Sequence, residues 1–316
     1  MKKIVFMLFL LFPLVGNAQQ TPEYSQYVLN SYGLDPAASG NSVQPEILFG
    51  RREQWKGFGG PLSQFISVNR AIYKKGYRRY WHGVGIYIEE DQAGLMTAKQ
   101  TAASYSFHLK VSRGYTAAFG VSVGTRSQAF QNSPSNKNDP ALVLYPAIIR
   151  MTPDINAGAR FYSKKFFLDV AVRQLYKNKM EQKDKMIGTP STLRPHIYAT
   201  IGQRFYSEDY YYMFEPSIHL QSTLTAFPSV SAGAMLYINK RVGIGLFGRW
   251  PESVYGVLQV RVYKNLLIGY AYDYTLSRLH IASANSQEFM VGITPMLAPE
   301  SFPGKTSNTN CPVFDF

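Results

Sequence analysis

The sequence predicts an all-β fold: a single transmembrane antiparallel β-barrel of about 14 strands, with both termini periplasmic. The first observation is a regular alternation of apolar and polar side chains, the pattern of β-strands. The second is that no run after the N-terminus approaches the roughly 20 apolar residues of a membrane-spanning helix. The third is composition. Aromatic residues make up 15% of the 316 residues and charged residues only 17%, whereas soluble proteins usually carry about 25% charged residues.

The N-terminus has the parts of a secretory signal peptide. Two lysines precede an apolar run over residues 4–15, and residues 16–18 (Gly-Asn-Ala) give the small-x-small ending that a signal peptidase cleaves. We therefore expect residues 1–18 to be a cleaved signal peptide and Gln19 to begin the mature chain. A buried N-terminal strand is the alternative interpretation. Export of a β-barrel predicts the cell outer membrane as its location.

The clearest alternation lies at residues 101–111. One face carries Thr101, Ala103, Tyr105, Phe107, Leu109 and Val111, and the other carries Ala102, Ser104, Ser106, His108 and Lys110. The same split recurs at 117–126, 154–161, 214–221, 230–238, 258–262 and 288–294. In a barrel the apolar face meets lipid and the polar face lines the lumen. An arginine at Val121 should therefore disrupt the barrel, and one at Ser122 should be better tolerated.

The predicted strands are close in length to the roughly 9–11 residues that a tilted strand needs to cross a membrane. They lie near 46–55, 63–72, 81–89, 97–111, 115–127, 154–162, 166–175, 194–205, 211–221, 228–238, 241–250, 253–263, 266–275 and 286–295. Every second connection is short. Those between are mostly longer, including Glu90 to Met96, as in bacterial barrels with short periplasmic turns and long outer loops. Trp55, Trp81 and Trp250 fall at strand ends, where an aromatic girdle is expected.

The barrel is expected to occupy residues 46–295 as one domain. Residues 19–45 are polar and rich in turn formers, and we expect a periplasmic N-terminal strap or plug there. Residues 296–316 are expected to be an extended periplasmic C-terminal tail. The tail holds Cys311, the single cysteine, so an intrachain disulfide is impossible. An idle thiol and a mixed disulfide with a periplasmic partner are both left open.

Motifs for enzymatic chemistry fail in their context. The GxGxxG pattern at 243–248 binds a dinucleotide only where a strand leads into a helix, and here it lies inside a predicted strand. The five histidines have no close pair and no cysteine partner, so no metal is expected. Ser104, Ser106 and His108 suggest a lipase, but the register turns all three away from lipid. We expect no catalytic residues, no cofactor and no enzymatic activity.

The register also places charged side chains on the lumen face. They are Lys110, Arg126, Arg160, Asp169, Arg173, Glu215, Arg261, Asp273 and Glu288. Mixed signs inside a barrel favour structural ion pairs, with a transport pathway as the alternative. The net charge of +13 is scattered along the chain rather than clustered, so nucleic acid is not expected as a partner.

Two N-terminal motifs and several weaker ones carry a family resemblance. The first is PEYSQY at 22–27 followed by Asn30 and LDPAASG at 34–40, and the second is REQWKGF at 52–58 followed by Pro61. Weaker motifs lie at 105–108, 153–158, 215–217, 270–273, 286–288 and 311–314. In these motifs the chain resembles the PorP/SprF family of the type IX secretion system over nearly all of its mature length. Asp35, Gly60 and Gln287 depart from the family's usual residues and leave the subfamily open.

The resemblance implies a non-enzymatic outer-membrane barrel that serves protein secretion and, in some members, gliding motility. The implied partners are outer-membrane lipids, periplasmic type IX secretion lipoproteins, a peptidoglycan-linked adaptor, and a secreted adhesin or other cargo with a sorting domain. A core translocon component and a cargo-specific partner are both compatible with it. An outer-membrane porin or solute channel is the alternative function. A lipid-modifying barrel enzyme would need a hydrolytic group on the lipid face or rim, and the sequence offers none.

The best-matched motif predicts a candidate partner-docking site at the top of the first hairpin. Its residues are Gln54, Trp55, Gly57, Phe58 and Pro61. A tryptophan in such a position is a typical interface hot spot. The alternative is a purely structural turn, in which the glycines permit tight backbone angles and Trp55 packs in the girdle.

Overall fold

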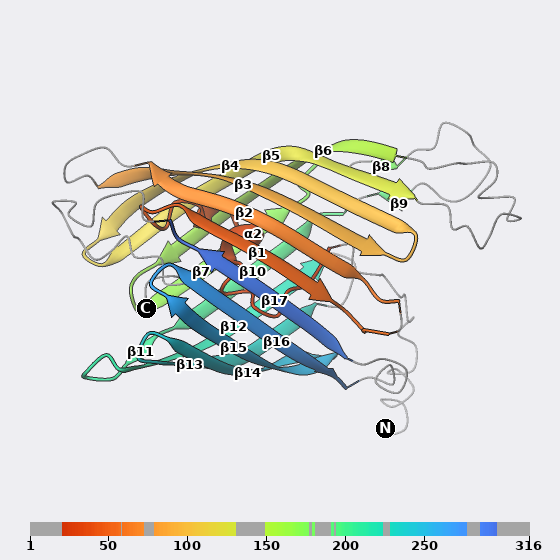
Figure 1. Ribbon diagram of the computed structural model, residues 1–316. Helices are drawn as coiled ribbons and strands as arrows, with labels where there is room; N and C mark the ends of the chain where they lie inside the picture. The colour runs from red at the N-terminus through yellow and green to blue at the C-terminus, as the bar shows by residue number, and fades with distance from the viewer. Residues whose placement is uncertain are drawn as a thin grey trace, which may run out of the picture.

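The computed structural model describes residues 21–57, 59–72, 79–130, 149–176, 179–180, 191–192, 194–223, 228–276 and 285–295. Among them, 15 strands form one antiparallel sheet, which closes into a barrel because β1 pairs with β17 and β10 pairs with β12 (Figure 1). The two-residue β11 only lengthens the pairing along β12, so fourteen of the 15 strands surround the lumen. The predicted antiparallel β-barrel and its strand number are confirmed, and the periplasmic position of the termini stays a prediction.

The strand bounds follow the predicted ones closely. The barrel strands are β1 (Glu46–Glu53), β2 (Leu62–Ile72), β3 (Tyr80–Ala93), β4 (Met96–Ser112), β5 (Tyr115–Phe130), β6 (Ile149–Tyr162), β7 (Phe166–Arg173), β10 (His196–Gln203), β12 (Tyr212–Thr223), β13 (Ser229–Ile238), β14 (Val242–Trp250), β15 (Ser253–Tyr263), β16 (Leu266–Thr275) and β17 (Ser286–Ile293). The short strand β11 is Phe205–Tyr206, and β8 (Lys179–Met180) and β9 (Ser191–Thr192) form a separate pair. Among the described residues, no helix is long and apolar enough to cross a bilayer.

The two ends of the barrel differ, and we name them by their connections. The turn end carries the tight turns at 113–114, 239–241 and 264–265, and the loop end carries the connections at 54–61, 94–95 and 251–252. Asn239 and Lys240 both have positive φ, 49° and 53°, the backbone twist that suits a two-residue hairpin. β1 therefore runs from the turn end to the loop end.

Side chains alternate between lipid and lumen as predicted. On β4, the even-numbered residues from 102 to 110 are buried, and their odd-numbered neighbours face outward. On β5, Val121 is 49% exposed on the outside while Ser122 is 7% exposed on the inside. An exposed apolar surface on a membrane barrel is the face that contacts lipid.

Strands β3 to β5 continue beyond the apolar belt at the loop end. β4 has 17 residues and β5 has 16, more than the roughly 9–11 needed to cross a membrane. The outward side chains change from apolar at Ile86 and Ile88 to charged at Glu90 and Lys99, which pair at 3.3 Å. The expected long loop from Glu90 to Met96 is therefore wrong: only Gly94 and Leu95 connect the two strands, because the pairing extends past the belt.

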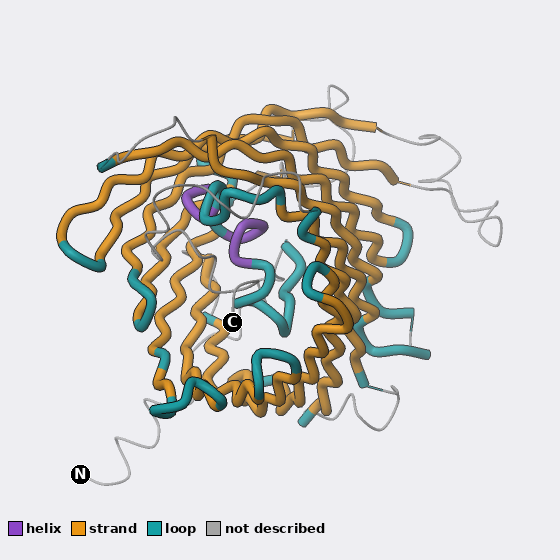
Figure 2. The backbone as a smooth tube through the Cα atoms, turned by 60° about the vertical axis from the view of Figure 1, so that its left-hand side comes forward, coloured by secondary structure: helices purple, strands orange, loops and turns teal. Residues whose placement is uncertain are grey.

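Residues 21–45, the inner segment, lie inside the ring of strands (Figure 2). They include two short helical turns, α2 (Ser31–Leu34) and η1 (Pro36–Ala38), and the Asp35 side chain caps η1 by accepting a hydrogen bond from the Ala37 N–H at 2.7 Å. Thr21 bonds Tyr198 near the loop end, and Ser42 accepts a bond from the Ala71 N–H near the turn end. The segment thus runs the length of the lumen before β1 begins.

Three tyrosines fix the inner segment to the wall. The hydroxyls of Tyr24, Tyr27 and Tyr32 bond Glu89 at 3.1 Å, Ser217 at 2.8 Å and Ser104 at 2.7 Å. All three rings are buried, and burial of a large side chain contributes roughly 1.5–3 kcal/mol. Glycines give the segment its space: a Cβ at Gly120 would collide with the Ala37 backbone, and one at Gly158 with the Asp35 carboxyl group.

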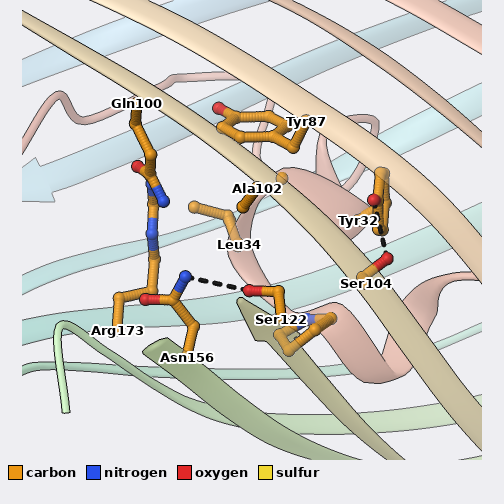
Figure 3. Close-up of a pocket in the computed structure, with 11 residues that line it drawn as sticks. Tyr32, Leu34, Tyr87, Gln100, Ala102, Ser104, Ser122, Asn156 and Arg173 are labelled. Atoms are coloured by element: carbon orange, nitrogen blue, oxygen red, sulfur yellow. Dashed lines mark hydrogen bonds between the residues drawn. The ribbon is translucent and has the colours of Figure 1, made fainter. Parts of the chain in front are cut away.

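Around Tyr32 and Leu34 the inner segment packs closely against the wall. The cavity in Figure 3 is lined by Tyr32 and Leu34 of the segment and by Ser122 and Asn156 of the wall, among others. Its volume of about 20 Å³ is room for a single water molecule. The Asn156 side-chain N–H donates to the Ser122 hydroxyl at 2.9 Å. The lumen face at Ser122 is therefore packed rather than open.

Trp81 does not belong to an aromatic girdle. Its side chain points inward, is 2% exposed and stacks on His108 with ring centroids 4.9 Å apart. Its indole N–H donates to the Gly40 carbonyl at 2.9 Å. Trp250, 70% exposed, stays on the outside as expected. The girdle assignment of Trp81 was wrong because position at a strand end does not decide which face a residue occupies.

Candidate functional site

The β1–β2 connection lies over the seam at which the barrel closes. The Gln54 N–H donates to the Pro61 carbonyl at 2.9 Å, which closes the loop. The Trp55 N–H donates to the Ser286 hydroxyl at 3.1 Å, and the Lys56 N–H to the Asn285 carbonyl at 2.9 Å. Since β1 is the first strand of the barrel and β17 the last, the loop bridges the two ends of the sheet.

Trp55 has a left-handed backbone conformation, with φ at 47°. This region is disfavoured for residues other than glycine, asparagine and aspartate, at a cost of roughly 1–2 kcal/mol. Its side chain is half-buried. Gly57 and Gly59 in the same loop also have positive φ, 87° and 72°, where the lack of a Cβ avoids the strain. Strained residues of this kind concentrate at functional sites.

Below the loop lies a buried group of charges, the mouth cluster: Glu23, Arg52, Arg249, Asp273 and Glu288. The Arg52 and Arg249 guanidinium groups both reach Asp273, at 2.7 and 2.8 Å. Arg52 also lies 3.3 Å from Glu288, and Arg249 3.0 Å from Glu23. A buried charge is tolerated only when it is paired, and here each guanidinium has two carboxylates.

The mouth cluster holds the start of the inner segment. The Ser25 hydroxyl donates to Asp273 at 2.8 Å and accepts a bond from Arg52 at 2.7 Å. The backbone N–H groups of Ser25 and Gln26 donate to Glu288 at 2.7 and 2.9 Å. The two guanidinium groups come from β1 and β14 and the carboxylates from β16, β17 and the inner segment, so the cluster also ties the two sides of the seam together.

A cavity of about 140 Å³, the mouth cavity, lies between the loop and the mouth cluster. Its lining residues are Arg52, Gln54, Trp55, Arg249, Glu252, Ser253, Asp273, Thr275 and Ser286. Glu252 lies in the turn between β14 and β15, and burial raises the pKa of its carboxyl group, with Glu23 adding to the effect. The cavity is therefore lined by one aromatic side chain, Trp55, together with polar and charged side chains.

The residues predicted for docking only partly come together. Gln54 and Trp55 line the mouth cavity, whereas Gly57 and Pro61 belong to the loop but not to the lining. Phe58 lies outside the described residues.

Sequence reasoning missed Arg249, Glu252 and Ser253. Arg249 and Ser253 are buried at inward positions of β14 and β15, so the alternation along these strands could have identified them as lumen residues. It could not have shown that β14 and β15 share a cavity with β1.

The other lumen charges are mostly paired, as the sequence suggested. Arg160 lies 3.1 Å from Asp169, Arg173 lies 3.0 Å from Glu89, and Arg204 lies 2.5 Å from Glu215. Ser106 and His108 face the lumen and contact the Ser39 carbonyl of the inner segment at 2.6 and 2.7 Å. Within the described residues, no group of three or more His, Cys, Asp or Glu side chains is placed to hold a metal ion.

Comparison with known families gives one match. The family model described as "Type IX secretion system membrane protein PorP/SprF" matches residues 16–293. That stretch contains the inner segment, every barrel strand and all residues of the mouth cavity. None of the curated proteins matches the chain.

Solved outer-membrane barrels show a distant likeness in fold. A mutant of the monoaromatic hydrocarbon channel TodX is 9% identical, with a TM-score of 0.46 over 85% of this chain and 92% of that one. A Pseudomonas aeruginosa FadL homologue is 10% identical, with a TM-score of 0.42 over 79% and 88%. BamA from Haemophilus ducreyi, lacking POTRA domains 1–3, is 9% identical, with a TM-score of 0.41 over 80% and 70%.

Proposed function

Because the chain belongs to the PorP/SprF family of type IX secretion system membrane proteins, we propose that it is a closed, non-enzymatic outer-membrane barrel that docks other proteins of the secretion process. On this proposal, transport is carried out elsewhere in the machinery. The barrel supplies a binding surface at each end and a fixed position in the membrane.

The occupied lumen is the observation that carries the proposal. The inner segment runs from the loop end to the turn end, and its residues Tyr24, Ser25, Tyr27 and Ala37 are at most 2% exposed. The cavity beside the segment holds about one water. A porin needs a continuous aqueous channel, so these contacts support a docking role over a solute channel.

We propose that the loop end faces the cell exterior and the turn end the periplasm, because bacterial barrels have short periplasmic turns and longer outer loops. The loop end would then dock a secreted adhesin or other sorting-domain cargo. The turn end would contact the periplasmic lipoproteins and the peptidoglycan-linked adaptor. Trp55 and the mouth cavity are the part of the loop end best suited to docking, since a half-buried tryptophan beside a polar cavity has the features of an interface hot spot.

Single-channel conductance of the purified protein tests the closed barrel. We expect no stable channel from the wild-type chain in a planar bilayer. A variant lacking residues 22–44 should form a conducting pore, because the lumen then loses its filling. Heat-modifiable migration on a gel checks that the variant still folds as a barrel. Steady wild-type conductance that the deletion leaves unchanged would favour the porin alternative.

Co-purification tests the docking role. A tagged wild-type protein, solubilised gently from cells, should retain secretion-system lipoproteins and sorting-domain cargo. Loss of the protein should reduce the amount of sorting-domain cargo at the cell surface and in the medium. Normal cargo export in its absence would contradict the proposal, whatever the conductance result.

A further inference from the structure

We propose that the mouth cavity binds one lysine or arginine side chain of a polypeptide docked at the loop end, with Glu252 as the counter-ion and Trp55 against the side chain's stem. The inference rests on the proposed function, because it names what the docked protein presents to this site. The site can be tested with a small molecule that carries the same charged group, without any cargo protein.

The charges around the cavity favour a cation. The lining carries two carboxylates, Glu252 and Asp273, and two guanidinium groups, Arg52 and Arg249. Glu288 and Glu23 lie outside the lining and pair with these guanidinium groups, so the lining and its ion-pair partners together hold a formal excess of two negative charges. Both guanidinium groups are already paired with Asp273, Glu288 and Glu23 at 2.7–3.3 Å. An anionic ligand would compete with those carboxylates for the two guanidinium groups. A cationic ligand would complete the charge balance instead.

Glu252 and Ser253 supply acceptors that the fold leaves unused. The half-buried Glu252 carboxylate has no hydrogen bond or ion pair within the described part of the chain, although its backbone N–H donates to the Arg249 carbonyl at 2.8 Å. Ser253 is 5% exposed, and its hydroxyl likewise has no partner among the described atoms. A buried polar group without a partner is costly. Ammonium and guanidinium groups are donors only and would satisfy both residues.

The size and the rim of the cavity suit one long side chain. Its volume of about 140 Å³ is close to the ~150 Å³ of a cavity that takes a benzene molecule. Trp55 lines the cavity, and an indole ring attracts a cation and packs against an aliphatic stem. Lys56 follows Trp55 in the loop but is exposed and does not line the cavity.

A blocked amino acid tests the site without any cargo protein. The full-length protein in detergent micelles is titrated with N-acetyl-arginine amide by calorimetry. N-acetyl-citrulline amide, which has nearly the same shape but no charge, is the matched probe. We expect saturable binding of the arginine probe and at least tenfold weaker binding of the citrulline probe. Equal binding of the two probes, or no binding of either, would overturn the inference.

Glu252→Gln is the deciding variant, and Glu208→Gln, in an exposed turn outside the cavity lining, is its control. We expect about tenfold weaker binding of the arginine probe by Glu252→Gln, the effect of losing one charge-assisted hydrogen bond, and no change for the control. Unchanged affinity in Glu252→Gln would overturn the site. If the Glu252→Gln protein no longer binds the arginine probe but cells that carry this variant export cargo normally, the cation site is supported and docking of cargo at this site is contradicted. If cargo export depends on Trp55 but the wild-type protein binds neither probe, docking at this site is supported and the cation site is contradicted.

Discussion

Trp55 occupies a backbone conformation that glycine adopts freely and tryptophan does not, with φ at 47°. Two other left-handed positions of this loop, Gly57 and Gly59, are occupied by glycine. The loop geometry alone would therefore be satisfied by glycine at residue 55 as well. What the tryptophan adds is an indole ring at the rim of the mouth cavity, at a cost of roughly 1–2 kcal/mol in strain.

Trp55→Gly separates the two roles of this residue. It removes the indole and also the strain, so the barrel should assemble at wild-type abundance or above, with unchanged heat-modifiable migration. Cargo export, measured as sorting-domain protein in the medium by mass spectrometry, should fall several-fold if Trp55 makes the proposed docking contact. Trp250→Ala, at an exposed tryptophan outside the cavity, should leave export unchanged. A drop in barrel abundance that parallels the drop in export would show that Trp55 is structural.

The charge state of Glu252 sets a pH dependence for cation binding. Burial raises the pKa of Glu252; Glu23 and Asp273 raise it further, whereas Arg249 and Arg52 oppose the rise. A carboxyl group with a raised pKa takes up its proton at a higher pH than usual, and only the ionised form attracts a cation. Affinity for N-acetyl-arginine amide should therefore fall as the pH is lowered, beginning above the ordinary carboxyl range near 4.3. Calorimetry between pH 8 and 5 should show the decline in the wild type and a flatter profile in Glu252→Gln.

At the scale of the element, β5 shows how strictly the two faces of a strand differ. Val121 is 49% exposed on the lipid side, where an arginine near the bilayer midplane costs about 2–4 kcal/mol. Val121→Arg should reduce the folded fraction on a heat-modifiability gel, while Val121→Leu should not. Equal assembly of the two variants would mean that the assigned register of β5 is wrong.

The neighbouring position needs a revised expectation. Alternation predicts that Ser122→Arg faces the lumen and is better tolerated than Val121→Arg. Ser122 does face inward, but it is 7% exposed, bonds Asn156 at 2.9 Å and lines a cavity of about 20 Å³ beside the inner segment. An arginine has no room there without displacing that segment. The expectation assumed that water fills the lumen beside Ser122, but the inner segment occupies that space.

At the scale of the whole molecule, the difference between the barrel's ends predicts its orientation. In a Cys311→Ser background, single cysteines at Lys56 and Leu95 test the loop end, and those at Lys164 and Lys240 test the turn end; all four positions are exposed. A membrane-impermeant maleimide should label the first pair on intact cells and the second pair only after the outer membrane is opened. The reverse labelling pattern would invert the proposed orientation and place the mouth cavity in the periplasm.

The barrel itself could be derived from the sequence because a strand's two faces repeat every two residues. Residues 101–111 and 214–221 alternate so regularly that strand positions, facing and number followed from local pattern alone. The lumen charges followed in the same way, and Arg160 and Asp169 form the expected kind of pair. Two expectations failed. Trp81 was assigned from its position at a strand end, although the alternation along β3 puts it on the same face as the buried Tyr87 and Glu89. The tight turn after Ala93 depends on how far β3 pairs with β4, which period two does not encode.

The tertiary structure decided what fills the barrel and what forms the site. Residues 21–45 have no long periodic pattern, and their position depends on contacts such as Ser25 with Glu288, 263 positions apart. The mouth cavity joins residues of the consecutive strands β14 to β17 with residues of β1, and β1 becomes their neighbour only when the sheet closes. Alternation fixes the face on which each side chain lies, because that is a property of one strand. Which lumen side chains meet depends on closure of the barrel and on the segment inside it.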